Sequence, residues 1–134
     1  MTAFQPTLKM STYLLALTVG ELDSTEATLP AFEGKSTTVR CYTTRGSKER
    51  GAYALSAAVK ALNLYQRQFG SAFPLPKVDM VAVPDFAAGA MENWGLVLYR
   101  ETALLVDPAL SSDADRQRVA VVVAHELAHD LRSC

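Results

Sequence analysis

Cysteine is scarce in this chain. Among its 134 residues only Cys41 and Cys134 occur, and they lie far apart. This number and spacing exclude a disulfide framework and a C-x-x-C metal site. Because disulfides are rare in reducing compartments, the composition favours the cytoplasm without fixing a compartment.

Long apolar runs and charge of one sign are also missing. No run approaches the roughly 20 apolar residues of a membrane-spanning helix, so we expect no membrane segment in this chain. The 13 Lys and Arg residues nearly balance the 14 Asp and Glu residues, which leaves a net charge of −1. We therefore expect no nucleic-acid partner, since such partners require a basic surface. Apolar residues make up 49% of the chain, a proportion typical of a globular domain.

The first 45 residues predict β-structure. Residues 10–19 are rich in Thr, Tyr, Leu and Val and indicate a strand. The apolar stretch at 14–17 after Lys9 is also faintly similar to a signal peptide, but polar residues interrupt it. Residues 21–35 are polar and contain Pro30 and Gly34, which predicts a loop. Residues 37–43 alternate and predict a second strand.

Helical periodicity begins near residue 46, which is the candidate domain boundary. Ser47 is suited to cap a helix over 48–69, and Gly70 is suited to end it. Apolar residues recur there at helical spacing and predict a buried stripe of Leu55, Ala58, Val59, Leu62, Tyr65 and Phe69. Strands are expected at 77–83 and 96–99, with a loop at 85–93 between them. The pattern [ST]-x-x-[DE] at residues 112–115 predicts the start of a further helix.

That last helix carries the pattern H-E-x-x-H at residues 125–129. His125 and His129 fall one turn apart on one helix face, so both rings can reach one zinc ion. Glu126 can accept a proton from water activated by the metal. The alternative is two histidines and a glutamate on a solvated helix face, because so short a pattern also arises by chance.

A second group of residues lies upstream, in the expected loop. Glycine lets the backbone approach a ligand closely, and Glu92 could pair with a positive charge. A surface turn with a solvated carboxylate would also explain these residues. The group consists of Gly89, Ala90, Met91, Glu92 and Asn93.

Taken together, the two groups resemble the zinc aminopeptidase family of aminopeptidase N and puromycin-sensitive aminopeptidase. Residues 89–93, 99–105 and 125–129 match its motifs in order and spacing, and residues 10–16 and 74–79 look like further pieces of the pattern. The resemblance covers nearly the whole chain. It implies an α+β fold, in which residues 1–45 end an N-terminal β-domain and residues 46–134 begin a truncated thermolysin-like zinc peptidase domain.

The resemblance also implies roles. His125 and His129 match the family's zinc ligands, and Glu126 matches its general base. Glu92 matches the residue that binds the free α-amino group of the substrate, and the rest of the motif at 89–93 matches substrate-binding residues. The implied cofactor is one zinc ion, and the implied partners are peptides with a free N-terminus.

The sequence departs from the family after His129. The family continues with Gln-Trp-Phe-Gly-Asn, whereas residues 130–134 read D-L-R-S-C, and the family's third zinc ligand lies beyond that point. Asp130 lies about 100° around the helix from His129, so we expect it to face away from the metal. Glu101 could approach the metal only through tertiary folding. Two hypotheses follow: an incomplete zinc aminopeptidase, or a non-catalytic truncated remnant or binding module that lacks the third ligand.

Overall fold

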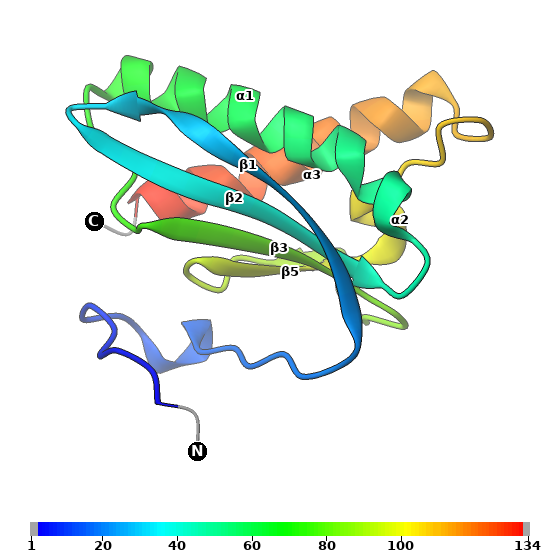
Figure 1. The fold of residues 1–134 in the computed structure, drawn as a ribbon, viewed down its shortest axis with the longest axis horizontal. Coiled ribbons are helices and arrows are strands. Elements are labelled where there is room, and N and C mark those ends of the chain that lie inside the picture. The colour runs from blue at the N-terminus through cyan, green and yellow to red at the C-terminus, as the bar shows by residue number, and fades with distance from the viewer. Residues whose placement is uncertain (1–2, 133–134) are drawn as a thin grey trace.

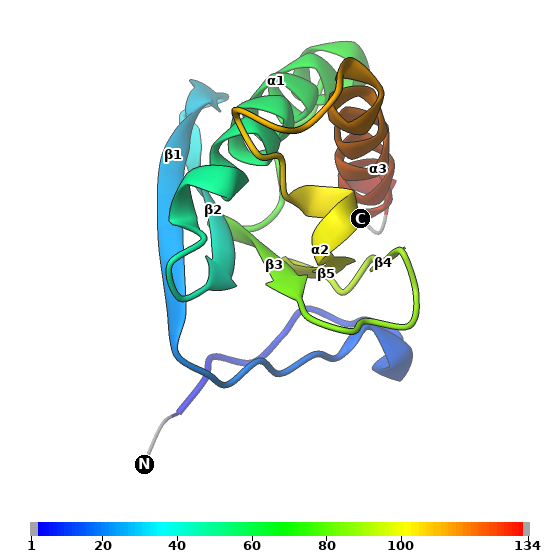
Figure 2. The same cartoon turned by 90° about the vertical axis from the view of Figure 1, so that its right-hand side faces the viewer.

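Two long helices lie side by side on one face of a five-stranded sheet (Figures 1 and 2). The computed structural model describes residues 3–132. The helices are α1 (Ala52–Phe69) and α3 (Asp113–Arg132). The N-terminal segment runs on the opposite side of the sheet (Figure 2). This is the α+β architecture that the sequence predicts.

The sheet has the strand order β1-β2-β3-β5-β4. The central pairs, β2 with β3 and β3 with β5, are parallel, whereas the outer pairs are antiparallel. Strands from both sides of residue 45 therefore share one sheet, and the predicted domain boundary at that residue stays a prediction. The bounds are β1 Leu22–Phe32, β2 Lys35–Thr44, β3 Lys77–Val83, β4 Ala90–Met91 and β5 Leu96–Arg100, with short helices η1 Thr12–Leu14, η2 Lys48–Gly51 and α2 Glu101–Leu104.

The polar segment before residue 35 is a strand, so the predicted loop at 21–35 is wrong. Residues of β1 pair in register with β2, from Leu22 opposite Thr44 to Leu29 opposite Thr37. Because β1 lies at the edge of the sheet, polar side chains and a proline are tolerated in it. The real turn is two residues long, Glu33 and Gly34, with φ of 51° and 74°. Two positive φ values are what a type I′ hairpin requires.

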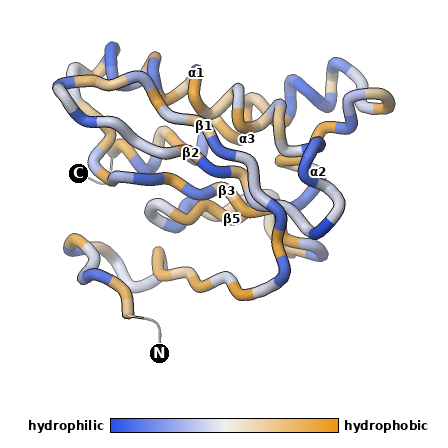
Figure 3. The backbone as a smooth tube through the Cα atoms, in the orientation of Figure 1, coloured by the Kyte–Doolittle hydropathy of each residue, from blue (hydrophilic) through white to orange (hydrophobic). Residues whose placement is uncertain are grey.

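The predicted strand at 10–19 is also wrong. This segment contains only the short helix η1 and otherwise has no regular structure. Leu14 is buried, but the alternating apolar residues after it are exposed, at 71% for Leu15, 74% for Leu17 and 88% for Val19. Figure 3 shows the apolar stretch along this segment. Alternation alone does not make a strand, because the backbone groups also need a partner to complete the ladder.

The two predicted helices are confirmed. Helix α1 ends at Gly70, which has the left-handed φ of 64° that glycine adopts most readily. Ser47 precedes η2 but makes no side-chain capping hydrogen bond, so its predicted role as a cap is wrong. Helix α3 begins with a reciprocal capping box. The Asp115 amide donates to Ser112 Oγ at 3.2 Å, and the Ser112 amide donates to Asp115 Oδ2 at 2.8 Å.

Packing holds α3 in place although valine is a weak helix former. Val119, Val123 and Leu127 recur one turn apart and are at most 1% exposed. Burial of each such side chain contributes about 1.5–3 kcal/mol. Of the predicted stripe on α1, Leu55, Ala58, Val59 and Leu62 join the same core, whereas Tyr65 is only partly buried and Phe69 is 54% exposed. Within the described residues, no helix is long and apolar enough to cross a bilayer.

Candidate metal and substrate site

The two histidines of the H-E-x-x-H pattern lie near the C-terminal end of α3, on its exposed side. Their Nε2 atoms are 3.2 Å apart, and the rings meet edge to face with centroids 4.9 Å apart. Two imidazole nitrogens at about 2.0–2.1 Å from a tetrahedral zinc ion are themselves about 3.3–3.4 Å apart. The distance between the Nε2 atoms of His125 and His129 is therefore close to that expected for two ligands of one zinc ion.

Within the described residues, the two histidines have no third candidate metal ligand beside them. In residues 3–132, no three His, Cys, Asp or Glu side chains are grouped so that they could hold a metal ion. Glu101 lies elsewhere, at the start of α2, where its Oε1 accepts a hydrogen bond from Thr44 Oγ1 at 3.4 Å. Asp130 is 1% exposed while His129 is exposed, which confirms that its carboxylate faces away from the histidine side of the helix.

Glu126 points into the protein and is 8% exposed. Burial raises the pKa of its carboxyl, the neighbouring His125 lowers it, and the charge of Glu92 raises it. Helix α3 also contacts strand β4, which directly precedes Glu92, so the fold brings the two sequence motifs near each other. A carboxyl with a raised pKa is a better proton acceptor near neutral pH.

The upstream motif forms the outer edge of the sheet next to α3. Strand β4 pairs with β5 through Ala90 opposite Tyr99 and Met91 opposite Leu98. It ends the strand order, so its outer edge has no strand partner within the described part of the chain. Such an edge presents backbone N–H and C=O groups that can pair with an extended peptide. Glu92 follows directly after this strand.

The side chain of Asn93 is engaged inside the protein. It is 4% exposed, and its Nδ2 donates a hydrogen bond to the carbonyl of Leu14 at 3.2 Å. Its predicted contact with substrate stays a prediction, and the amide group meanwhile ties the motif to the N-terminal segment. Sequence reasoning could not find this contact, because the two partners are far apart in the chain.

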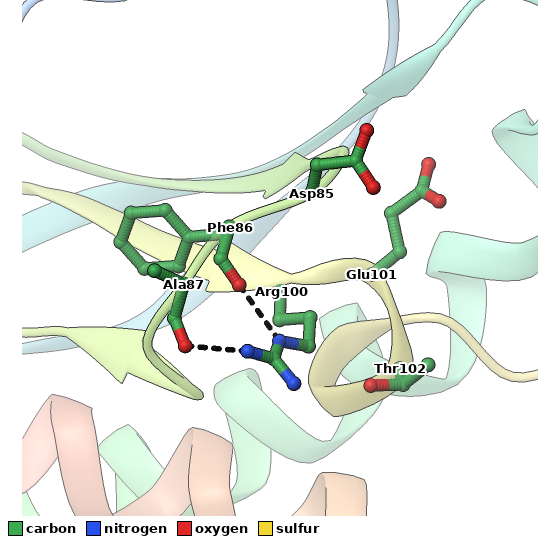
Figure 4. Close-up of a pocket in the computed structure, with 6 residues that line it drawn as sticks. All are labelled: Asp85, Phe86, Ala87, Arg100, Glu101 and Thr102. Atoms are coloured by element: carbon green, nitrogen blue, oxygen red, sulfur yellow. Dashed lines mark hydrogen bonds between the residues drawn. The ribbon is translucent and has the colours of Figure 1, made fainter.

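Arg100 holds the loop that leads into the motif, a role the sequence analysis missed. Its Nε donates to the carbonyl of Phe86 at 2.8 Å, and its Nη2 donates to the carbonyl of Ala87 (Figure 4). Its backbone N–H also donates to the carbonyl of Gly89 at 2.9 Å. The residues joined by the side chain of Arg100 lie beside a surface hollow of about 390 Å³. This hollow is lined by Asp85, Phe86, Ala87, Arg100, Glu101 and Thr102.

Comparison with known proteins identifies the family of the chain. Residues 53–131 match the Peptidase family M1 domain. That stretch contains all of α1 but its first residue, the 89–93 motif, and all of the H-E-x-x-H helix but its last residue.

Three curated relatives cover most of the chain. Aminopeptidase M1-A of Oryza sativa subsp. japonica is 57% identical over 126 residues, which is 94% of this chain and 14% of the relative. Puromycin-sensitive aminopeptidase of Caenorhabditis elegans is 51% identical over 126 residues, 94% of this chain and 13% of the relative. Endoplasmic reticulum aminopeptidase 2 of Homo sapiens is 47% identical over 126 residues, which is 94% of this chain and 13% of the relative. The chain thus spans only a small part of the length of the relatives it matches.

Proposed function

The chain belongs to the peptidase M1 family, and on that premise we propose that it forms part of the active site of a zinc-dependent aminopeptidase. The observation that carries the proposal is the 3.2 Å spacing of the Nε2 atoms of His125 and His129. These two rings would hold the zinc ion. When bound, zinc acts as a Lewis acid and lowers the pKa of water toward neutrality.

Two carboxylates have separate roles in the proposed reaction, one in proton transfer and one in substrate binding. Glu126 accepts the proton of the attacking water and passes it to the leaving amine. Glu92 pairs with the ammonium group of the substrate, and its fixed place beside Glu126 limits cleavage to the first residue of a peptide. The open edge of β4, at Ala90 and Met91, lets an extended substrate lie along Gly89 and this strand. Asn93, the last residue of the motif, is proposed to bind substrate as well.

A second candidate function rests on the ligand count. Because the described residues supply only two ligands, the chain by itself would bind zinc weakly and orient it poorly. It would then be a non-catalytic remnant or a binding module. The substrates and partners of the complete relatives, and the cytoplasmic location that the cysteine content favours, remain proposals for this chain. One relative is named for the endoplasmic reticulum.

Zinc content and aminoacyl-anilide hydrolysis of the purified chain separate the two candidates. Stoichiometric zinc, with turnover that Glu126→Gln abolishes, would rule out the remnant. A folded chain that binds no zinc would rule out an active chain. Glu92→Gln tests the substrate site, because it should weaken binding of a free amino terminus while leaving zinc content unchanged. The matched comparison is an N-acetylated substrate, whose binding Glu92→Gln should not weaken.

A further inference from the structure

A carboxylate is buried directly after the second histidine. Asp130 is 1% exposed and lies at the C-terminal end of α3. Burial of a carboxylate is costly unless hydrogen bonds compensate for the lost water. Burial raises the pKa of the Asp130 carboxyl to about 7, and its Oδ1 has no hydrogen-bond partner within the described residues, so its contacts are made through Oδ2 and the backbone carbonyl.

Asp130 holds the two residues that follow the upstream motif. Its Oδ2 accepts a hydrogen bond from the backbone N–H of Gly95 at 3.4 Å. Its own carbonyl accepts a hydrogen bond from the indole Nε1 of Trp94 at 3.2 Å. One residue of the histidine-bearing helix thus binds both the side chain and the backbone of the segment immediately after Glu92 and Asn93.

Gly95 is itself fixed to the sheet. Its carbonyl accepts hydrogen bonds from Lys77 Nζ at 2.9 Å and from the backbone N–H of Asp79 at 3.1 Å. Its φ is +74°, and a Cβ there would lie 2.7 Å from Leu75 Cδ1. Asp130 is therefore attached to a point of the sheet that cannot easily move.

The contact between Asp130 and Gly95 opposes rotation of α3 about its axis. Glu126 and Asp130 are one turn apart and both buried, whereas His125 and His129 form the adjacent exposed stripe. Rotation of the helix would break the bond to Gly95 and move both stripes relative to Glu92. The Asp130 contact therefore resists a change in the distance from the histidines to Glu92.

We propose that Asp130 is a positioning residue that locks the Glu92 loop to the helix carrying His125 and His129. Its carboxyl acts on Gly95 and its backbone carbonyl on Trp94, and neither group is assigned to the metal or the substrate. The functional meaning of this lock rests on the function proposed above, because only an aminopeptidase needs Glu92 at a fixed distance from the metal.

Trp94 makes the lock measurable without metal, since it is the only tryptophan of the chain. In the metal-free 134-residue chain, Asp130→Ala removes the acceptor of Gly95 but keeps the backbone carbonyl that binds Trp94. It should therefore speed exchange of the Gly95 amide by about tenfold and, because the loop loosens, increase acrylamide quenching of Trp94. Asp130→Asn keeps an acceptor for Gly95 and should restore both values. Asp113→Ala, at the exposed other end of α3, is the matched control and should change neither.

Zinc provides the second readout. In the wild-type chain and in Asp130→Asn, zinc binding at the histidines should shift Trp94 emission, and in Asp130→Ala the shift should be lost while zinc affinity, measured by chelator competition, stays similar. If zinc fails to bind the wild-type chain, the proposed metal site is wrong, and the metal-free measurements still decide the lock. The lock is refuted if Asp130→Ala folds with unchanged quenching and exchange. Fast exchange of Gly95 in the wild-type chain would refute it too, even if Asp130→Ala does not fold.

Discussion

The hydroxyl of Tyr65 donates a hydrogen bond to the carbonyl of Ala124 at 3.0 Å. Tyr65 lies on α1 and Ala124 on α3, immediately before His125. The contact joins the two helices of the layer at the turn from which the first histidine projects. It places that turn relative to the sheet, on which both helices pack.

Tyr65→Phe should destabilise the fold by about 0.5–1.5 kcal/mol, because it removes one partly buried hydrogen bond and keeps the ring. A thermal melt followed by circular dichroism would show this as a drop of several degrees in Tm. Tyr13→Phe is the matched control, since Tyr13 is 62% exposed and should melt with the wild type. Equal melting of both variants would mean that the hydroxyl of Tyr65 contributes nothing to stability.

Arg100→Lys should loosen the loop before the substrate motif while keeping the positive charge. A lysine has one donor group and cannot bridge the carbonyls of Phe86 and Ala87 in the fixed geometry of a guanidinium. Hydrogen exchange should speed up in residues 86–91 and stay unchanged in α1. Arg67→Lys, on the exposed face of α1, is the control. If residues 86–91 exchange at the same rate in Arg100→Lys and in Arg67→Lys, the proposed role of Arg100 is contradicted.

The capping box predicts a pH dependence of stability. Hydrogen bonds from the Ser112 hydroxyl and backbone N–H lower the pKa of the Asp115 carboxyl in the folded chain. A lowered folded pKa contributes stability above the unfolded pKa, about 3.9, and this contribution is lost as pH falls through the folded value. Asp115→Asn should therefore have a lower Tm than the wild type at pH 6, and the difference in Tm should become smaller toward pH 2. A difference that is constant with pH would show that ionisation of Asp115 plays no part.

The thiol of Cys41 should resist alkylation in the folded chain. Burial raises its pKa to about 12, so about one thiol in ten thousand is ionised at pH 8. In a Cys134→Ser background, iodoacetamide labelling measured by mass spectrometry should be slow in buffer and rapid in denaturant. Rapid labelling of Cys41 in buffer would show that the sheet opens often at β2.

The helices and the motifs were predictable from the sequence because their signals are local. Helical periodicity predicts α1, the capping box at 112–115 predicts the start of α3, and the H-E-x-x-H spacing places both histidine rings on one face. The strands β3 and β5 were also predictable from short apolar runs bounded by turn residues.

The wrongly predicted loop at 21–35 and strand at 10–19 are segments whose structure depends on distant partners. The polar segment β1 is a strand because it forms a ladder of backbone pairs with β2. Large apolar residues recur at every second position in 15–19 as well, but this segment pairs with no strand in the described part of the chain. Neither outcome is visible in a single segment, because strand pairing joins residues that are not neighbours in sequence.

The sequence by itself determined the chemistry that the chain can offer: two histidines one helical turn apart, a glutamate between them, and a second glutamate after a glycine-led motif. Only the tertiary structure decided how these groups meet. It turned Glu126 inward, brought Glu92 close enough to raise the pKa of Glu126, and attached Asp130 to Gly95. The reason is physical: spacing on one helix follows from its geometry, whereas contact between a helix and a sheet edge follows from packing of the whole core.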